Sequence, residues 1–110
     1  MGGTPPFHVD IVNSVMVRVC SVTPEQETGL SELGFKPMAY GNSRLWHVDV
    51  PADDEALAEL FAGLCDLDCA FSKVHGTAQQ MERLRAAGKI DRPYRQIDWS
   101  APGEWDISEI

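Results

Sequence analysis

The sequence predicts an α+β protein with a ferredoxin-like, split βαβ arrangement, in which an antiparallel sheet carries two helices on one face. Three observations support this prediction: a period-two apolar pattern, a strongly amphipathic helical stripe, and strand-like segments bounded by turn residues. In chain order the elements read β-α-β-β-α-β over residues 7–76. Residues 77–110 add a C-terminal helix and an irregular tail to the same domain, and the Gly- and Pro-rich residues 1–6 are expected to be flexible.

The first predicted strand occupies residues 7–22, where apolar side chains fall mostly on odd positions. Such alternation is typical of a half-buried strand. Asn13 and Ser14 interrupt the pattern, which leaves a bent strand or a tight hairpin as alternatives. The odd parity continues beyond the interruption, and this favours one strand.

A short helix is predicted to follow. Thr23 is a suitable N-cap, Pro24 suits the first helical position, and Gln26 completes a capping box. Gly34 can end the helix, and Gly29 within it weakens the helix.

Residues 36–50 predict a hairpin with its turn at Gly41–Ser43. Its second strand presents two sets of side chains: Trp46, Val48 and Val50 on one face, and Leu45, His47 and Asp49 on the other.

Pro51 is expected to open the strongest helix, with acidic residues in its first turn. Its apolar stripe has helical spacing and comprises Leu57, Leu60, Phe61, Leu64 and Cys65. A short strand follows at 68–74, and a last helix is capped by Thr77 and ended by Gly88.

The composition is that of one globular domain of 110 residues, with 44% hydrophobic and 24% charged residues. No apolar run approaches the roughly 20 residues that a membrane helix needs, and the first residues lack the pattern of a signal peptide. Three cysteines are an odd count, so we expect a cytoplasmic protein with reduced thiols.

The net charge of −8 is distributed unevenly. Residues 1–76 carry four basic and eleven acidic side chains, residues 77–95 carry five basic and two acidic, and residues 96–110 carry four acidic side chains and no basic one. A surface this acidic repels phosphate, so nucleic-acid binding over the whole surface is not expected.

Two cysteines, Cys65 and Cys69, precede His75, and this spacing raises the question of a metal or redox site. Cys65 lies on the apolar stripe, where a free cysteine behaves as a small hydrophobic residue. A zinc site needs four ligands, and only His75 and the distant Cys20 could complete this one. The pattern favours core residues over a metal site and leaves a redox role as the alternative. No cofactor is predicted.

A second group consists of Arg18, Cys20, His47 and Asp49, which are expected on the sheet face without helices. A histidine with a nearby carboxylate can act as a general base. The same residues are more typical of a solvated or partner-covered sheet face, and this interpretation is favoured over catalysis.

The last helix and the residues after it are basic, with Arg83, Arg85, Lys89, Arg92 and Arg95. With Tyr94 they could contact phosphate or RNA, or they could pair with the chain's own acids. The predicted open face lacks the stacking aromatics of RNA-binding sheets, so nucleic-acid contact is expected at most weakly, through Arg83, Arg85 and Arg92.

The tail alternates acidic with large apolar residues and contains Trp99 and Trp105. It either packs across the bare sheet face or docks on another protein, because tryptophan is enriched at interface hot spots.

The leading functional prediction is a small, non-enzymatic protein-binding or regulatory module. It could inhibit a nucleic-acid-handling complex by presenting carboxylates in place of phosphates. The predicted binding residues are Asp53, Asp54, Glu55, Glu59, Trp99 and Trp105, with Asp66 and Asp68 continuing the acidic surface.

The alternative is a small enzyme or ligand-binding homodimer with a pocket on the open sheet face. His47 would be the base, Asp49 would orient it, and Arg18 would stabilise developing charge.

Overall fold

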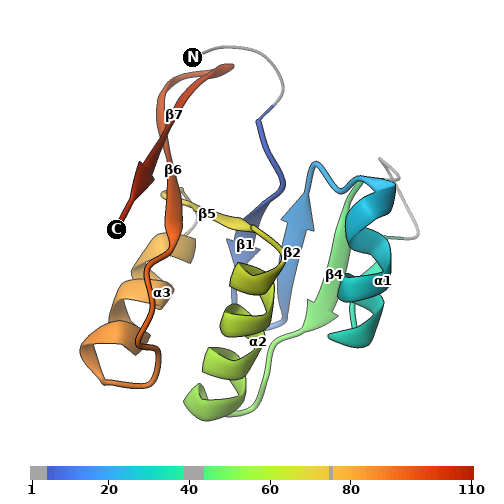
Figure 1. Ribbon diagram of the computed structural model, residues 1–110, viewed down its shortest axis with the longest axis vertical. Helices are drawn as coiled ribbons and strands as arrows, with labels where there is room; N and C mark the ends of the chain where they lie inside the picture. Colours follow the sequence, from blue (N-terminus) through green and yellow to red (C-terminus); the bar gives the residue numbers. More distant parts are fainter. Residues whose placement is uncertain (1–4, 39–43, 75) are drawn as a thin grey trace.

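A computed structural model describes residues 5–38, 44–74 and 76–110 (Figure 1). The described residues form three helices and seven strands. In chain order these are β1 (His8–Val12), β2 (Met16–Cys20), α1 (Pro24–Glu32), β3 (Lys36–Pro37), β4 (Trp46–Asp49), α2 (Asp54–Asp66), β5 (Ala70–Ser72), α3 (Thr77–Ala86), β6 (Arg95–Ala101) and β7 (Glu104–Glu109).

The strands form one open, mixed sheet in the order β3-β4-β2-β1-β5-β6-β7. The β1–β5 and β5–β6 pairs are parallel, and the other pairs are antiparallel. The α+β class is confirmed, but the ferredoxin-like arrangement is wrong. The predicted first strand is two strands, and β1 lies between β2 and β5. The sheet is also not purely antiparallel, because β1–β5 and β5–β6 are parallel pairs.

The first predicted strand is in fact the β1–β2 hairpin, and Asn13 explains the reversal. The Asn13 Oδ1 atom accepts hydrogen bonds from Val15 N at 2.8 Å and Met16 N at 2.9 Å. The Asn13 amide also donates to the Met16 carbonyl at 3.1 Å. An asparagine side chain that satisfies the following amides closes a tight turn.

The start of α1 follows the predicted capping signals, whereas the starts of α2 and α3 differ from the prediction. Gln26 Oε1 accepts from Thr23 N at 2.9 Å, which is the capping-box contact at the start of α1. α2 begins three residues after Pro51, because Asp53 is its N-cap and accepts from Ala56 N at 2.8 Å. Thr77 is the first residue of α3 rather than its cap, which is Gly76.

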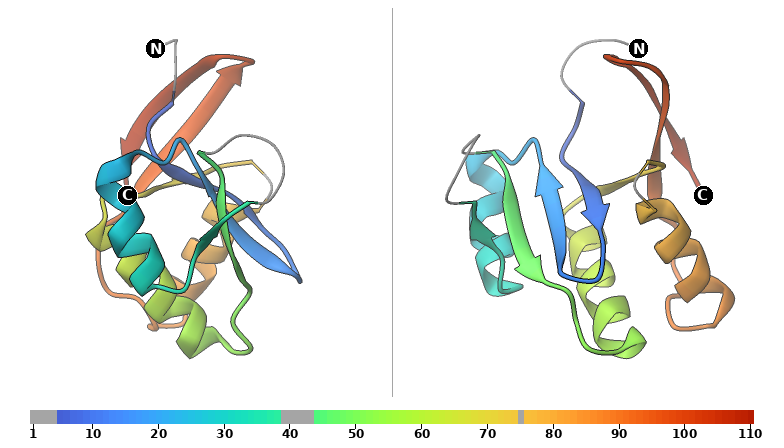
Figure 2. Two further views of the ribbon diagram at one scale, coloured as in Figure 1. Left: turned by 90° about the vertical axis from the view of Figure 1, so that its right-hand side faces the viewer. Right: turned by 180° about the vertical axis from the view of Figure 1, so that it is seen from behind.

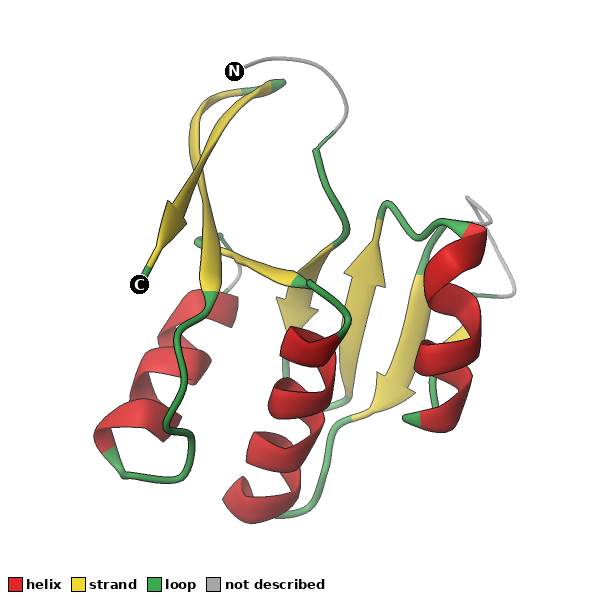
Figure 3. Cartoon of the chain, viewed as in Figure 1, coloured by secondary structure: helices red, strands yellow, loops and turns green. Residues whose placement is uncertain are grey.

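All three helices contribute to one core on one face of the sheet (Figure 3). The helical side chains of this core include Leu30, Leu57, Phe61, Leu64, Met81 and Leu84. They pack against alternate strand residues, among them Val9, Val17, Val19, Trp46 and Phe71. Viewed from behind, β1, β2 and β4 lie in front of α1 and α2, so this part of the sheet shows its other face (Figure 2).

Two glycines let α1 and α2 approach closely. A Cβ added at Gly29 would lie 2.5 Å from Leu67 Cδ2, and one added at Gly63 would lie 2.6 Å from Leu33 Cδ2. Leu67, which follows α2, therefore packs at Gly29 of α1, and Leu33, which follows α1, packs at Gly63 of α2. The glycine that weakens α1 as an isolated helix leaves room for the Leu67 side chain in this position.

The predicted irregular tail is wrong, since the chain ends in the β6–β7 hairpin rather than in a helix and a loop. Gly103 has φ +79° and allows the turn between the two strands. Trp99 lies opposite Trp105, and Ile97 lies opposite Ile107. These side chains and Ala70 form a second, smaller apolar cluster.

The predicted 36–50 hairpin is confirmed by the antiparallel β3–β4 pair, with Lys36 opposite His47. Its predicted turn at 41–43 lies outside the described residues, as do His75 and residues 1–4 of the predicted flexible N-terminus.

The end of α2 yields a prediction about stability. Cys69 N donates to Leu64 O and Asp68 N donates to Cys65 O, both at 3.0 Å. This is a Schellman motif with Asp68 at φ +60°, in the position that glycine prefers. We expect Asp68→Gly to raise the free energy of unfolding by about 0.5–1 kcal/mol, because relief of backbone strain outweighs the added freedom of the unfolded chain.

Urea denaturation measures this change, and Asp68→Ala is the matched control because it removes the carboxylate but keeps a Cβ. A glycine variant no more stable than the alanine variant would contradict the backbone explanation.

Candidate functional site

Arg18 and His47 lie opposite each other on neighbouring strands, as the open-face prediction requires. Arg18, however, is engaged by Asp10, with contacts of 3.0 Å to Oδ1 and 2.6 Å to Oδ2. This hydrogen bond raises the pKa of Arg18 and satisfies its charge inside the sheet. Asp49 is exposed at the end of β4, opposite Met16 rather than Arg18. The catalytic roles of these residues stay a prediction.

Cys20 pairs with His8, a residue that sequence reasoning missed. The Cys20 Sγ lies 3.1 Å from His8 Nε2, and His8 Nδ1 lies 2.7 Å from the Pro6 carbonyl. The carbonyl contact requires the proton on Nδ1, which leaves Nε2 as an acceptor for the thiol. Burial lowers the pKa of His8 and raises the pKa of Cys20 to about 12. The pair is therefore a neutral thiol and a neutral imidazole.

The two cysteines of the predicted clip, Cys65 and Cys69, belong to the core as expected. Cys69 is buried and Cys65 packs against the main cluster. Burial raises the pKa of both thiols. In the described part of the chain, which lacks His75, no three metal-binding side chains gather into a group.

Most of the acidic residues predicted for binding already have partners within the chain. Asp53 caps α2, and Asp54 forms a two-pronged ion pair with Arg83 at 2.6 and 3.0 Å. Glu55 lies 4.0 Å from Lys89. Glu59 is exposed and has no ion pair with any described residue.

The basic helix and the loop after it are matched to these acids. The Arg83 hydrogen bond lowers the pKa of Asp54, and Arg92 binds Asp66 at 2.8 Å. Arg85 stands 5.4 Å above the centre of the Tyr94 ring. Three cations suggested for weak phosphate contact therefore have internal partners, and nucleic-acid binding through them stays a prediction.

Both tryptophans lie in the β6–β7 hairpin. Trp105 is 8% exposed in the second cluster. Trp99 is half-buried, and its Nε1 donates to Ser72 Oγ at 3.0 Å. The tail does not lie across the bare sheet face as one alternative expected, because it extends the sheet beside β5 as β6 and β7. Docking of these residues on a partner stays a prediction.

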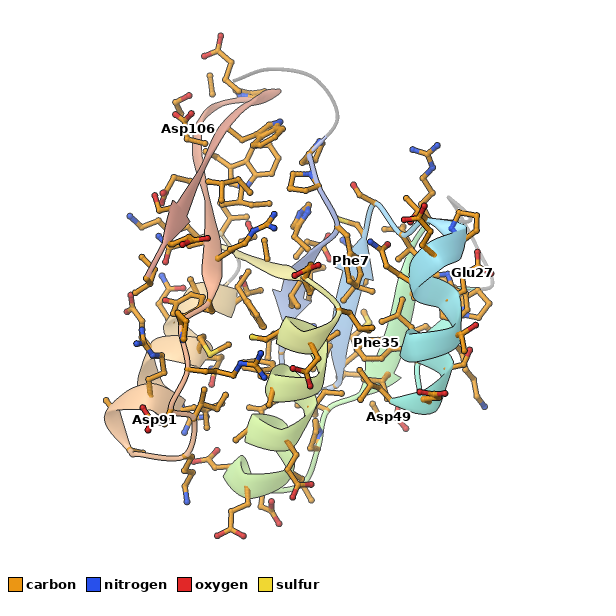
Figure 4. All side chains as sticks on the ribbon, viewed as in Figure 1. Phe7, Glu27, Phe35, Asp49, Asp91 and Asp106 are labelled. Carbon is orange, nitrogen blue, oxygen red and sulfur yellow. The ribbon has the colours of Figure 1, made fainter. Side chains whose placement is uncertain are left out.

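The structure assembles an acidic groove that the sequence did not indicate. We define it by three carboxylates, Glu32, Asp49 and Glu59, around a partly apolar floor of Leu33, Val48, Pro51, Ala56 and Leu60. The groove has a volume of about 310 Å³, and Figure 4 shows Asp49 near the lower end of α1.

The three carboxylates come from α1, β4 and α2, so no local sequence pattern groups them. None of the three has an ion pair or side-chain hydrogen bond with another described residue. The predicted Glu59 is thus part of a different acidic site from the one expected.

Comparison with known proteins gives no match, whether to a family model, a curated protein or a solved structure. Among the residues that the structure describes, none of the helices has both the length and the apolar character to cross a membrane. The evidence for function therefore comes from the chain's own residues.

The buried His8 yields a pH prediction. Its folded pKa lies below the ordinary value of 6.5, so the unfolded chain binds the proton more readily. Stability should therefore be complete above about pH 6.5 and fall as the pH decreases toward the folded pKa. Denaturation at pH 8 and pH 5 measures this loss, and we expect it to be smaller in His8→Gln. An equal loss in both proteins would assign the effect to other groups.

The Cys20 thiol yields a reactivity prediction. A pKa of about 12 instead of the ordinary 9.0 lowers the thiolate fraction near pH 8 by ~1,000-fold. We expect iodoacetamide to modify Cys20 correspondingly slowly in the folded protein and at an ordinary rate in urea, as followed by peptide mass spectrometry. Rapid modification in the folded state would show that His8 activates the thiol.

Proposed function

We propose that the protein is a binding module whose acidic groove receives an arginine or lysine side chain from a partner protein. The observation that carries this proposal is the combination of three unpaired carboxylates with an apolar floor. A lysine or arginine consists of an aliphatic stem and a cationic head, and it buries the stem on apolar surface while the head stays polar.

The floor and rim match those two parts of a basic side chain. Leu33, Val48 and Leu60 offer carbon surface to the stem, and the carboxylates of Glu32, Asp49 and Glu59 line the same groove, where they can meet the head. The planar fork of an arginine can donate hydrogen bonds to two such carboxylates. A purely hydrophobic ligand would give the three carboxylates of the groove no cationic partner.

The charge of the whole protein supports the same kind of partner. A net charge of −8 attracts basic surfaces and increases their association rate. Proteins that handle nucleic acids carry basic surfaces of this kind, so a regulatory role in which the groove competes with phosphate is part of the proposal. The groove replaces Asp53, Asp54 and Glu55 as the proposed contact, because those three carboxylates have internal partners.

The test uses fluorescence anisotropy with a labelled arginine-rich nonapeptide as the probe. We expect the combined Glu32→Gln, Asp49→Asn and Glu59→Gln variant to bind at least tenfold more weakly, because three charge contacts are removed. The matched control, Glu25→Gln, Glu82→Gln and Glu104→Gln, removes the same charge elsewhere and should lose much less affinity. Equal losses in the two variants would reduce the effect to net charge and contradict a specific groove.

The same pair of variants can identify a natural partner. We expect affinity capture from a cell lysate, read by mass spectrometry, to retain a basic protein with the control variant and to lose it with the groove variant. A set of captured proteins that is identical for both variants would count against the groove.

A further inference from the structure

A second pocket lies where the end of α2, the loop before β6 and the end of β7 meet. It has a volume of about 210 Å³ and is lined by residues that include Cys65, Asp68, Cys69, Arg92, Arg95 and Glu109. It shares no residue with the acidic groove. An engineered cavity of about 150 Å³ is large enough to bind benzene, so this pocket can hold a small organic molecule.

Arg95 is the unusual residue of this pocket. Its Nε atom is buried and has no hydrogen-bond partner, the only such side-chain nitrogen or oxygen in the described part of the chain. The Arg95 guanidinium also forms no ion pair with a described residue, although Glu109 lies opposite it on β7. A buried charged donor without an acceptor is costly, and its presence calls for a specific explanation.

The two carboxylates of the pocket, Asp68 and Glu109, are exposed to solvent and available to a ligand. Arg92 is occupied by Asp66, whereas Asp68 and Glu109 have no ion pair or side-chain hydrogen bond with a described residue. The pocket thus combines one unpaired guanidinium with two unpaired carboxylates. A simple anion would satisfy Arg95 but would be repelled by the carboxylates, and a simple cation would leave Arg95 unsatisfied.

A ligand that satisfies both kinds of group carries both charges. We propose that this pocket binds a free α-amino acid, with the ligand carboxylate on the Arg95 guanidinium and the ligand ammonium group near Asp68 and Glu109. The ligand side chain would meet the remaining wall, which Cys65, Pro93 and Tyr94 help to form. Burial raises the pKa of Cys65, so this wall stays uncharged.

The test is a nuclear magnetic resonance titration of the full chain with alanine, valine and leucine as separate probes. We expect at least one of them to cause saturable shifts of the Arg95 and Glu109 amides. The corresponding carboxylic acid without the amine, and the amine without the carboxylate, should each bind at least tenfold more weakly, because each satisfies only one kind of group.

Two variants test the assignment, and a third is the control. Arg95→Gln and Glu109→Gln should each weaken binding at least tenfold, whereas Lys36→Gln, a similar charge change on β3, should leave it unchanged. Glu109 lies on the edge strand, so its variant keeps the test valid if Arg95→Gln unfolds. Three outcomes would overturn the proposal: no saturable shift up to 10 mM, equal binding of the acid that lacks the amine, or binding that survives both substitutions.

Discussion

The turn at Asn13 is the constraint on which the rest of the sheet depends. Its side chain accepts hydrogen bonds from the Val15 and Met16 amides, so the chain reverses after the five residues of β1. The reversal places β1 next to β2 and leaves the other edge of β1 for parallel pairing with β5. β5 then pairs in parallel with β6, and β6 pairs antiparallel to β7. Without the reversal, β5 would lie beside a strand that runs in the direction of β2, and the pair would be antiparallel rather than parallel.

Sequence reasoning succeeded where structure is determined locally. The capping box of α1 and the acidic start of α2 are interactions between residues three apart, so they can be read from the chain. It failed at the first hairpin because the apolar parity continues through the turn. A bulge between Val9 and Ile11 shifts the register by one residue, and this irregularity hides the reversal from a period-two pattern. The prediction for the tail failed for another reason. Its acidic residues obscured the alternation of apolar and polar side chains in the two strands that flank Gly103.

The candidate site was less predictable from the sequence, because tertiary contacts decide which carboxylates are paired and which are free. Asp54 and Arg83 are 29 positions apart, and their pairing removes one predicted binding carboxylate. The groove, in turn, combines side chains of α1, β4 and α2, which are distant in the sequence. In the sequence Gly29 indicated only a weak helix, and Gly63 and Glu32 gave no signal. Of the acids named from the sequence, the groove contains two: Glu59, predicted for binding, and Asp49, predicted to orient His47.

The two edges of the sheet have a consequence for how copies of this protein behave in concentrated solution. A free edge strand offers unpaired backbone groups to other chains and invites aggregation. Here β3 has only two residues, one of them Pro37, which has no amide hydrogen to offer. The opposite edge, β7, carries Glu104, Asp106 and Glu109, so two copies approaching edge to edge would bring like charges together. The carboxylates of β7 therefore oppose the pairing of two copies edge to edge at this side of the sheet.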